Sequence, residues 1–235
     1  MNDIIDQGNG YYEKWHKHNS GKLYRRTFKK VYGVGINDAD YTIKPTIENN
    51  RSKCMYYEKW IKMLQRCYSK SYQEKHPSYK GCSVCEEWLI FSNFKSWMEQ
   101  QEWEGKHLDK DLLVYKNKIY SPETCCFVTQ TVNSFLVLRE ADRGKYPIGV
   151  HYRKRCSDMV NDFSKPFGAT IGNHNRYIGV FSSKEEAHSA WQKAKIEQAK
   201  QLQSEQTDLK VVLELQRIID MLQYEYDNNL ETKYF

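Results

Sequence analysis

Apolar side chains recur at three- and four-residue spacing in two stretches of the first half of the chain. This spacing predicts helices over residues 56–69 and 85–100. The second stretch carries too many large apolar side chains for a single face, so we expect it to be buried against two neighbours. We assign both helices to a domain over residues 56–139, with the second helix as its hub.

The alternation of apolar and polar residues is typical of strands in two other places. Residues 106–133 predict a strand, a tight loop, a second strand and a short helix that continues through Leu138. Residues 31–36, V-Y-G-V-G-I, predict a hairpin. The residues before this hairpin are basic, and we expect residues 1–55 to form an arm or a cover rather than a core.

A polar segment followed by Pro147 marks a domain boundary. Three β-like stretches come after it, over residues 148–152, 167–171 and 176–181. A helix then begins with a capping box, in which Ser182 or Ser183 pairs with the glutamate three residues later. Its small residues let this helix lie close to the sheet, so we assign residues 147–203 to one domain.

A last helix is predicted over residues 207–226, again from apolar residues at helical spacing. It either packs on the preceding domain or pairs with another copy of the chain in a homodimer. The predicted fold class is α+β: helices plus a ββα hairpin, then a three-stranded antiparallel sheet packed on one helix, then the terminal helix.

The charge is unevenly distributed along the chain. Lys plus Arg exceed Asp plus Glu by 36 − 30 = 6, and residues 143–176 alone hold seven basic against two acidic residues. A local excess of this kind suits a polyanionic partner. No apolar run approaches the roughly 18 residues needed to span a bilayer, and residues 1–10 lack an export signal. We therefore expect a protein of a reducing cytoplasm that does not enter membranes.

The cysteines are candidates for a metal site. Their number, seven, is odd, which favours thiols or a metal site over a disulfide framework. Cys82 and Cys85 have the spacing of a zinc knuckle, and Cys125 is a candidate third ligand. No second pair has this spacing, so the alternative is that these residues are buried thiols.

Three motifs after the domain boundary carry a family resemblance. They are P-I-G-V at 147–150, G-A-T-I at 168–171 and Y-I-G-V-F-S-S-K-E-E-A-H-S-A-W at 177–191. Their order resembles the Apetala-type, or ethylene-response-factor, DNA-binding domain. The resemblance implies that the exposed face of three strands lies in the major groove of double-stranded DNA. Thr170 and Gly172 replace an acidic residue and an Arg of the plant domain, so the sequence preference is expected to be low or different.

Alternation along these strands separates a helix-facing side from a DNA-facing side. Ala169, Ile171, Ile178 and Phe181 are expected to face the helix. The candidate DNA-binding residues are His151, Arg153, Lys154, Arg155, Thr170, Arg176 and Tyr177. The alternative is that this basic sheet is a solvated cover of the core.

Residues 106–133 carry candidate chemistry of a second kind. Asp109, Asp111 and Asn117 offer oxygen ligands of the type that holds a hard divalent cation, Mg²⁺ or Mn²⁺. L-D-K at 108–110, E-T-C-C-F at 123–127 and Asn133 resemble, in order, the motifs of phage HNH endonucleases. The stretches W-I-K-M-L-Q-R-C-Y and G-C-S-V-C-E-E-W are similar to the same group of phage proteins.

The HNH resemblance implies a catalytic set of Asp109, a general base beside it and Asn133 on the following helix. Lys110 stands where the family has the basic His, and Thr124 where it has Asn. A lysine with the ordinary pKa near 10.4 is protonated and accepts no proton. His107 lies on the opposite face of a regular strand from Lys110, so it substitutes only if the strand is bulged.

These features lead to one interpretation with one alternative. The leading interpretation is a phage DNA-binding protein of the HNH homing-endonuclease type, in which metal-dependent cleavage of phosphodiesters is impaired. The alternative is a non-catalytic protein that keeps both DNA-binding surfaces. It would act as a regulator or as a counter-defence factor that binds a host protein.

Overall fold

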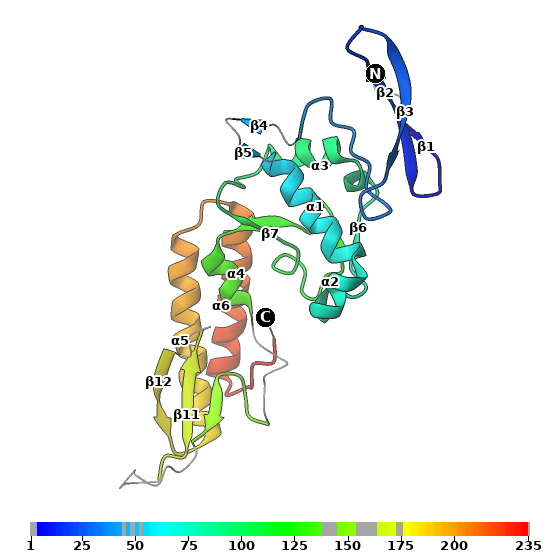
Figure 1. The fold of residues 1–235 in the computed structure, drawn as a ribbon. Coiled ribbons are helices and arrows are strands. Elements are labelled where there is room, and N and C mark those ends of the chain that lie inside the picture. The colour runs from blue at the N-terminus through cyan, green and yellow to red at the C-terminus, as the bar shows by residue number, and fades with distance from the viewer. Residues whose placement is uncertain are drawn as a thin grey trace. The chain divides into compact units, whose positions relative to one another are not determined.

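The computed structural model describes residues 4–43, 46–47, 50–51, 54–137, 145–153, 164–172 and 176–234 (Figure 1). The chain divides into two compact units, which we name unit 1 (Met1–Glu104 with Lys116–Phe127) and unit 2 (Gly105–Tyr115 with Val128–Phe235). Every helix in the described ranges is too short or too polar to cross a membrane. The domain limits predicted from the sequence, 1–55, 56–139, 147–203 and 207–226, stay predictions.

Unit 1 begins with an antiparallel sheet of β1 (Ile5–Asp6), β2 (Tyr11–Lys17) and β3 (Leu23–Lys29), in that order. Tyr11 pairs with Lys29 and Lys17 with Leu23, so β2 and β3 form a regular hairpin. The hairpin predicted at residues 31–36 is only a tight turn, closed by a single bridge between Val31 and Gly35. A further pair, β4 (Thr46–Ile47) with β5 (Asn50–Arg51), is antiparallel.

The helical core of unit 1 starts with α1 (Met55–Tyr68), which confirms the first predicted helix to within one residue. Its buried stripe consists of Tyr57, Trp60, Met63, Leu64 and Cys67. The indole N–H of Trp60 donates to the Trp88 carbonyl at 2.7 Å, which ties the helix to the next element. The short helices α2 (Lys70–Lys75) and η1 (Pro77–Tyr79) follow.

The prediction of one continuous helix over residues 85–100 is wrong. A 3₁₀ turn, η2 (Glu87–Leu89), precedes Ile90, and α3 (Phe91–Met98) begins after it. Ile90 is extended because its neighbours bond to Ile36: the Ile36 N–H donates to Leu89 O at 2.8 Å, and the Phe91 N–H donates to Ile36 O at 3.0 Å. The burial of this region is confirmed at Trp88, Phe91, Phe94 and Met98.

Ile36 and Tyr12 are also buried. The expectation that residues 1–55 lie outside the core is therefore wrong at these two positions. The side chain of Tyr12 is held by its hydroxyl, which donates to the Asn37 carbonyl at 2.8 Å.

The predicted order of strand, loop, strand and helix is confirmed as β7 (His107–Asp109), β9 (Cys126–Val128) and α4 (Gln130–Leu136). The helix ends at Leu136, and the predicted end at Leu138 lies outside the described residues. The chain returns to unit 2 at Val128, the last residue of β9, and in unit 2 β7 packs against α4. The predicted loop contains a further strand, β8 (Ile119–Tyr120), which pairs in parallel with β6 (Ser83–Val84) of unit 1.

The rest of unit 2 has the predicted order of three strands and two helices. The sheet β10 (Val150–Tyr152), β11 (Phe167–Ile171) and β12 (Arg176–Phe181) is antiparallel in that order. One face packs on α5 (Lys184–Ser204), and α6 (Leu209–Asp227) packs along α5. The α+β fold class is therefore confirmed, and the last helix packs on the domain that precedes it.

The start of α5 confirms the predicted capping box. Ser183 is the N-cap, and its hydroxyl accepts the N–H of Glu186 at 3.1 Å. The Glu186 carboxylate accepts in return from the N–H and the hydroxyl of Ser182, at 3.2 and 2.7 Å. The buried side of α5 is not purely apolar, because it includes the polar residues His188, Gln192 and Lys195.

Candidate nucleic-acid interface

The helix-facing side of the β10–β12 sheet agrees with the prediction at three positions of four. Ala169 and Ile171 are buried against α5, and Phe181, which pairs with Phe167 two residues before Ala169, lies on the same face although it is only half-buried. The register shifts between Ala169 and Thr170, which pair with Gly179 and Tyr177, so Ile178 is left without a partner of its own. This bulge bends β12 away from regular alternation, which the sequence pattern does not reveal.

The opposite side, here called the outer face, presents polar side chains. His151 pairs with Gly168, and Thr170 pairs with Tyr177. Gly168 and Thr170 flank the buried Ala169 on β11, so these two residues and their partners lie on the side of the sheet opposite to Ala169. Tyr177 is 65% exposed, and His151 is also exposed. A Cβ at Gly168 would lie 2.5 Å from His151 Nε2, so glycine lets the imidazole lie across β11 and keeps the face flat.

Cationic groups lie beside the outer face. Alternation places Arg153 on the same side as His151, directly after β10. Its N–H donates to Pro166 O at 2.9 Å and its Nη1 donates to Lys165 O at 3.1 Å, which hold the guanidinium next to the start of β11. Lys154 and Arg155 lie outside the described residues.

Arg176 does not share the outer face. It pairs with Ile171, whose side chain is buried against α5, and the same register therefore assigns Arg176 to the helix-facing side. Its exposure comes from its place at the first residue of β12. The structure thus brings together His151, Arg153, Thr170 and Tyr177 of the predicted DNA-binding set.

The sheet is held on α5 by a close contact at Gly149. This residue has φ +78°, and a Cβ there would lie 2.0 Å from Trp191 Cδ1. Both the left-handed backbone and the lack of space require glycine. The contact therefore places the backbone of P-I-G-V directly against the tryptophan of α5.

A buried polar network fastens the C-terminal tail to α5. The Thr232 N–H donates to His188 Nε2 at 3.0 Å, so Nδ1 carries the hydrogen of the neutral ring and donates to Ile148 O at 3.0 Å. Gln192 Nε2 donates to the Thr232 hydroxyl oxygen at 3.0 Å, and that hydroxyl donates to Glu225 at 2.5 Å. These polar side chains therefore have a structural role in unit 2.

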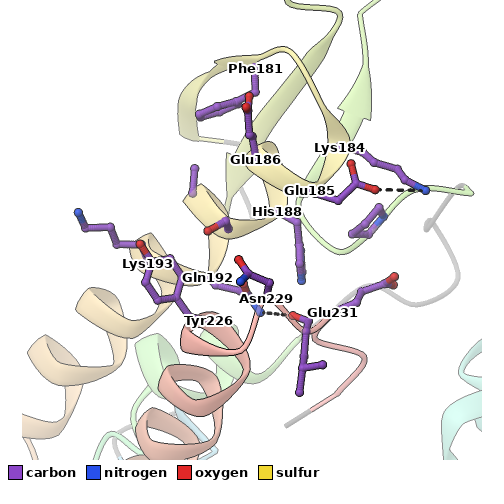
Figure 2. Close-up of a pocket in the computed structure, with 14 residues that line it drawn as sticks. Phe181, Lys184, Glu185, Glu186, His188, Gln192, Lys193, Tyr226, Asn229 and Glu231 are labelled. Carbon is purple, nitrogen blue, oxygen red and sulfur yellow. Dashed lines mark hydrogen bonds and ion pairs between the residues drawn. The ribbon is translucent and has the colours of Figure 1, made fainter.

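A groove of about 550 Å³ lies beside this network, where β12 ends, α5 begins and α6 ends (Figure 2). Its charged lining side chains are Lys184, Glu185, Glu186, Lys193 and Glu231. Lys184 and Glu185 lie 3.7 Å apart, as the dashed line in Figure 2 marks. The lining mixes both signs, and the buried His188 and Gln192 are already bonded to the tail, so the groove does not select a charged ligand.

The β7 region has a different arrangement from a metal site. Asp109 Oδ1 accepts the N–H groups of Asp111 at 2.9 Å and Leu112 at 2.7 Å, which closes the turn after the strand. Burial raises the pKa of Asp109 above its ordinary value, although these two N–H groups oppose the shift. Asp109 therefore caps a turn and is less readily ionised than an exposed aspartate.

Lys110 is buried, and its Nζ lies 2.6 Å from Asp111 Oδ1. Leu108 and Lys110 are buried whereas His107 and Asp109 are half-buried, so the strand alternates regularly and His107 shares a face with Asp109 rather than with Lys110. Regular alternation removes the bulge through which His107 would replace Lys110.

The oxygens predicted to hold Mg²⁺ or Mn²⁺ have other partners. Asn117 belongs to unit 1, where its Nδ2 donates to Ile119 O at 2.6 Å and its Oδ1 accepts the Ile119 N–H at 3.0 Å. Asp111 is bound by Lys110, and Asp109 by its turn. As they stand, these side chains do not fit a divalent cation. Asn133 is half-buried on α4.

The cysteines do not form a metal site within the part of the chain that the structure describes. There, no three or more His, Cys, Asp or Glu side chains are grouped so that they could hold a metal ion. Cys82 and Cys125 are buried, and burial raises the pKa of the half-buried Cys85 thiol. A raised pKa disfavours the thiolate that zinc requires. Structural zinc at these three cysteines stays a prediction.

A buried lysine was not identified from the sequence. Lys195 Nζ donates to the Phe135 carbonyl at 2.7 Å and lies 3.7 Å from the centre of the Phe135 ring, which joins α5 to α4. Desolvation by burial lowers the pKa of Lys195 to about 7. Helical spacing offers a signal for it, because Lys195 stands four residues after Trp191 and four before Ala199, which are both buried.

Comparison of the chain with protein families, with curated proteins and with solved structures gives no match. The interpretation of the outer face and of the β7 region therefore depends on their geometry.

Proposed function

We propose that this chain is a phage DNA-binding protein that binds double-stranded DNA through the outer face of the β10–β12 sheet, in the cytoplasm of the host cell. One observation carries the proposal: α5 covers one face of a three-stranded sheet, and the other face is left with His151, Arg153, Thr170 and Tyr177. A polar sheet face on which His151 and Tyr177 are exposed, with the basic Arg153 at its edge, is suited to a polyanion.

The chemistry of this face suits the major groove. The groove admits strands of a sheet, and its base edges offer donors and acceptors to hydroxyl groups. Thr170 and Tyr177 supply these hydroxyls at adjacent register positions. Arg153 lies at the edge of the face, where it would contact a phosphate and set the position of the sheet on the duplex.

We further propose that the β7 region is structural and not hydrolytic. Lys110 is buried against Asp111, and the Asp109 carboxylate accepts two backbone N–H groups, so neither a general base nor a set of unoccupied oxygen ligands supports cleavage. In this proposal the resemblance to HNH endonucleases concerns the ββα architecture, and the protein acts as a regulator.

Titration of a fluorescein-labelled 20-base-pair duplex, followed by anisotropy at several salt concentrations, tests the DNA-binding face. Thr170→Ala with Tyr177→Ala is expected to weaken binding about tenfold, and Arg153→Ala is expected to lower the salt slope by about one. Lys210→Ala, an exposed cation at the start of α6, is the matched control and leaves both unchanged. Equal affinity for all four proteins would exclude the face.

A cleavage assay with Mg²⁺ and with Mn²⁺ tests the second part. We expect no cut product from the unaltered chain. Metal-dependent cutting that Asp109→Ala abolishes would show that the β7 region is catalytic, and it would leave the proposed DNA-binding face untouched.

A further inference from the structure

The β2–β3 hairpin carries a concentration of positive charge that the proposed function does not use. Residues 11–29 hold six Lys or Arg against one Glu, a net charge of 6 − 1 = +5 in a chain whose total is +6. Among the described residues, no ion pair neutralises Lys17, Lys22, Arg25, Arg26 or Lys29. Exposed cations without internal partners attract a polyanion.

One face of the hairpin places two of its cations, Lys14 and Arg26, among aromatic rings. The register pairs Tyr12 with Phe28, Lys14 with Arg26 and His16 with Tyr24, so all six side chains lie on the same face. We call these six residues the ladder face. Three ring contacts run along it: Tyr12 to Phe28 at 5.6 Å, Phe28 to His16 at 6.4 Å and His16 to Tyr24 at 5.6 Å, with interplanar angles of 23°, 11° and 18°.

The two ends of the ladder face differ. At one end Tyr12 is buried, and Lys14 Nζ donates to Asn37 O at 3.1 Å and Ala39 O at 2.9 Å, so this end is fastened to the rest of unit 1. At the other end Tyr24 is 38% exposed. Arg26 is exposed beside it, with its guanidinium 5.3 Å from the Phe28 ring. The stack of rings therefore ends at the surface.

We propose that the ladder face binds single-stranded nucleic acid, with a base continuing the stack at Tyr24 and phosphates bound by Arg26 and its neighbouring cations. On this face Tyr24 is an exposed ring beside the exposed cation Arg26, and a ring and a cation so placed form the kind of surface on which unpaired bases stack without a requirement for sequence. A duplex offers its phosphates but not the faces of its bases, so the ring ladder favours the single strand. This site is separate from the β10–β12 sheet and does not depend on its function.

Binding of a fluorescein-labelled 12-nucleotide oligo-dT by the full chain, followed by anisotropy, tests the proposal. Tyr24→Ala is expected to weaken binding about tenfold, and Tyr24→Phe, which keeps the ring, to stay within about twofold. Arg26→Ala is expected to lower the affinity and to reduce the salt slope by about 0.7, the value for one phosphate of a single strand.

Two matched controls locate the site. Trp15 is 43% exposed on the opposite face of the same hairpin, so Trp15→Ala is expected to leave binding of oligo-dT within about twofold. Thr170→Ala with Tyr177→Ala, on the other sheet, is expected to leave it unchanged.

Several results would overturn the inference. They are wild-type affinity in Tyr24→Ala, a loss in Trp15→Ala as large as that in Tyr24→Ala, or a loss in Tyr24→Phe as large as that in Tyr24→Ala. An unlabelled duplex that displaces oligo-dT from the ladder face as well as the single strand does would equally exclude it. If Tyr24→Ala fails to fold, Tyr24→Phe and Arg26→Ala still decide the question.

Discussion

Replacement of Lys195 by methionine tests the energetic account of unit 2. The side chain is buried between α5 and α4, and burial lowers its pKa to about 7. Methionine fills similar space without a charge, so Lys195→Met removes a group whose protonation state differs between the folded and unfolded chains.

The sign and size of the effect follow from this pKa. In the unfolded chain the lysine titrates near its ordinary value of 10.5, so between pH 7 and 10.5 the unfolded state binds more protons than the folded state. The free energy of unfolding therefore rises with pH across this window. From pH 7 to pH 9 the expected gain is about 2 kcal/mol, because each pKa unit corresponds to about 1.36 kcal/mol.

Urea unfolding at pH 7, 8 and 9, with a reductant present, measures this gain. The quantity to compare is the difference in free energy of unfolding between the unaltered chain and Lys195→Met, in which the titrations of other groups cancel. Lys200→Met, an exposed lysine 3.2 Å from Glu197, is the control and is expected to keep the pH dependence of the unaltered chain.

Parallel curves of the free energy of unfolding against pH for the unaltered chain and Lys195→Met would refute a lowered pKa at Lys195. A constant offset between the curves has another cause, since methionine leaves the Phe135 carbonyl without its donor at every pH. Only the change of the difference with pH reports the pKa of Lys195.

Three further substitutions probe the contacts that build unit 2. Gly149→Ala is expected to destabilise by about 3 kcal/mol or more in thermal unfolding, because it combines a left-handed backbone with a clash against Trp191. Ser183→Ala removes the N-cap of α5 and is expected to cost about 1 kcal/mol in urea unfolding. Thr232→Val removes the hydroxyl that binds Glu225 and is expected to cost about 1 to 3 kcal/mol and to speed proteolysis of the C-terminal tail.

A second glycine separates the Trp191 contact from the effect of the left-handed backbone. Gly172 also has a positive φ, of +77°, but nothing lies within 4 Å of its Cβ position, so Gly172→Ala is expected to cost about 1 to 2 kcal/mol only. Equal losses at both glycines would argue against the Trp191 contact. Unchanged unfolding of Ser183→Ala, or unchanged proteolysis of Thr232→Val, would show that these bonds contribute nothing.

The elements that depend on short-range periodicity could be predicted from the sequence. The limits of β11 and β12 agree with the predicted residues, and α1 agrees to within one residue. The helix over residues 85–100 could not be predicted, because the backbone of Ile36, some fifty residues earlier, bonds on both sides of Ile90 and interrupts it. Local propensity contains no information about such a pairing.

The candidate site could likewise be predicted only in part. Alternation along the strands correctly places Thr170 and Tyr177 on one face, but it does not predict the bulge at Ile178 or the pairing of Arg176 with Ile171. At β7 the spacing of the carboxylates is compatible with a metal site, but the nearest donors decide their role. Two backbone N–H groups bind Asp109, and a buried lysine binds Asp111.

By itself the sequence determined the order of the elements in unit 2, the cap of α5, the charge of the chain and the polar side of the β10–β12 sheet, because each depends on residues close together along the chain. Only the tertiary structure decided which polar groups are buried and with what partner. His188, Gln192 and Lys195 occupy the covered side of α5 because Ile148, Phe135 and the C-terminal tail supply their hydrogen bonds from 38 to 60 residues away.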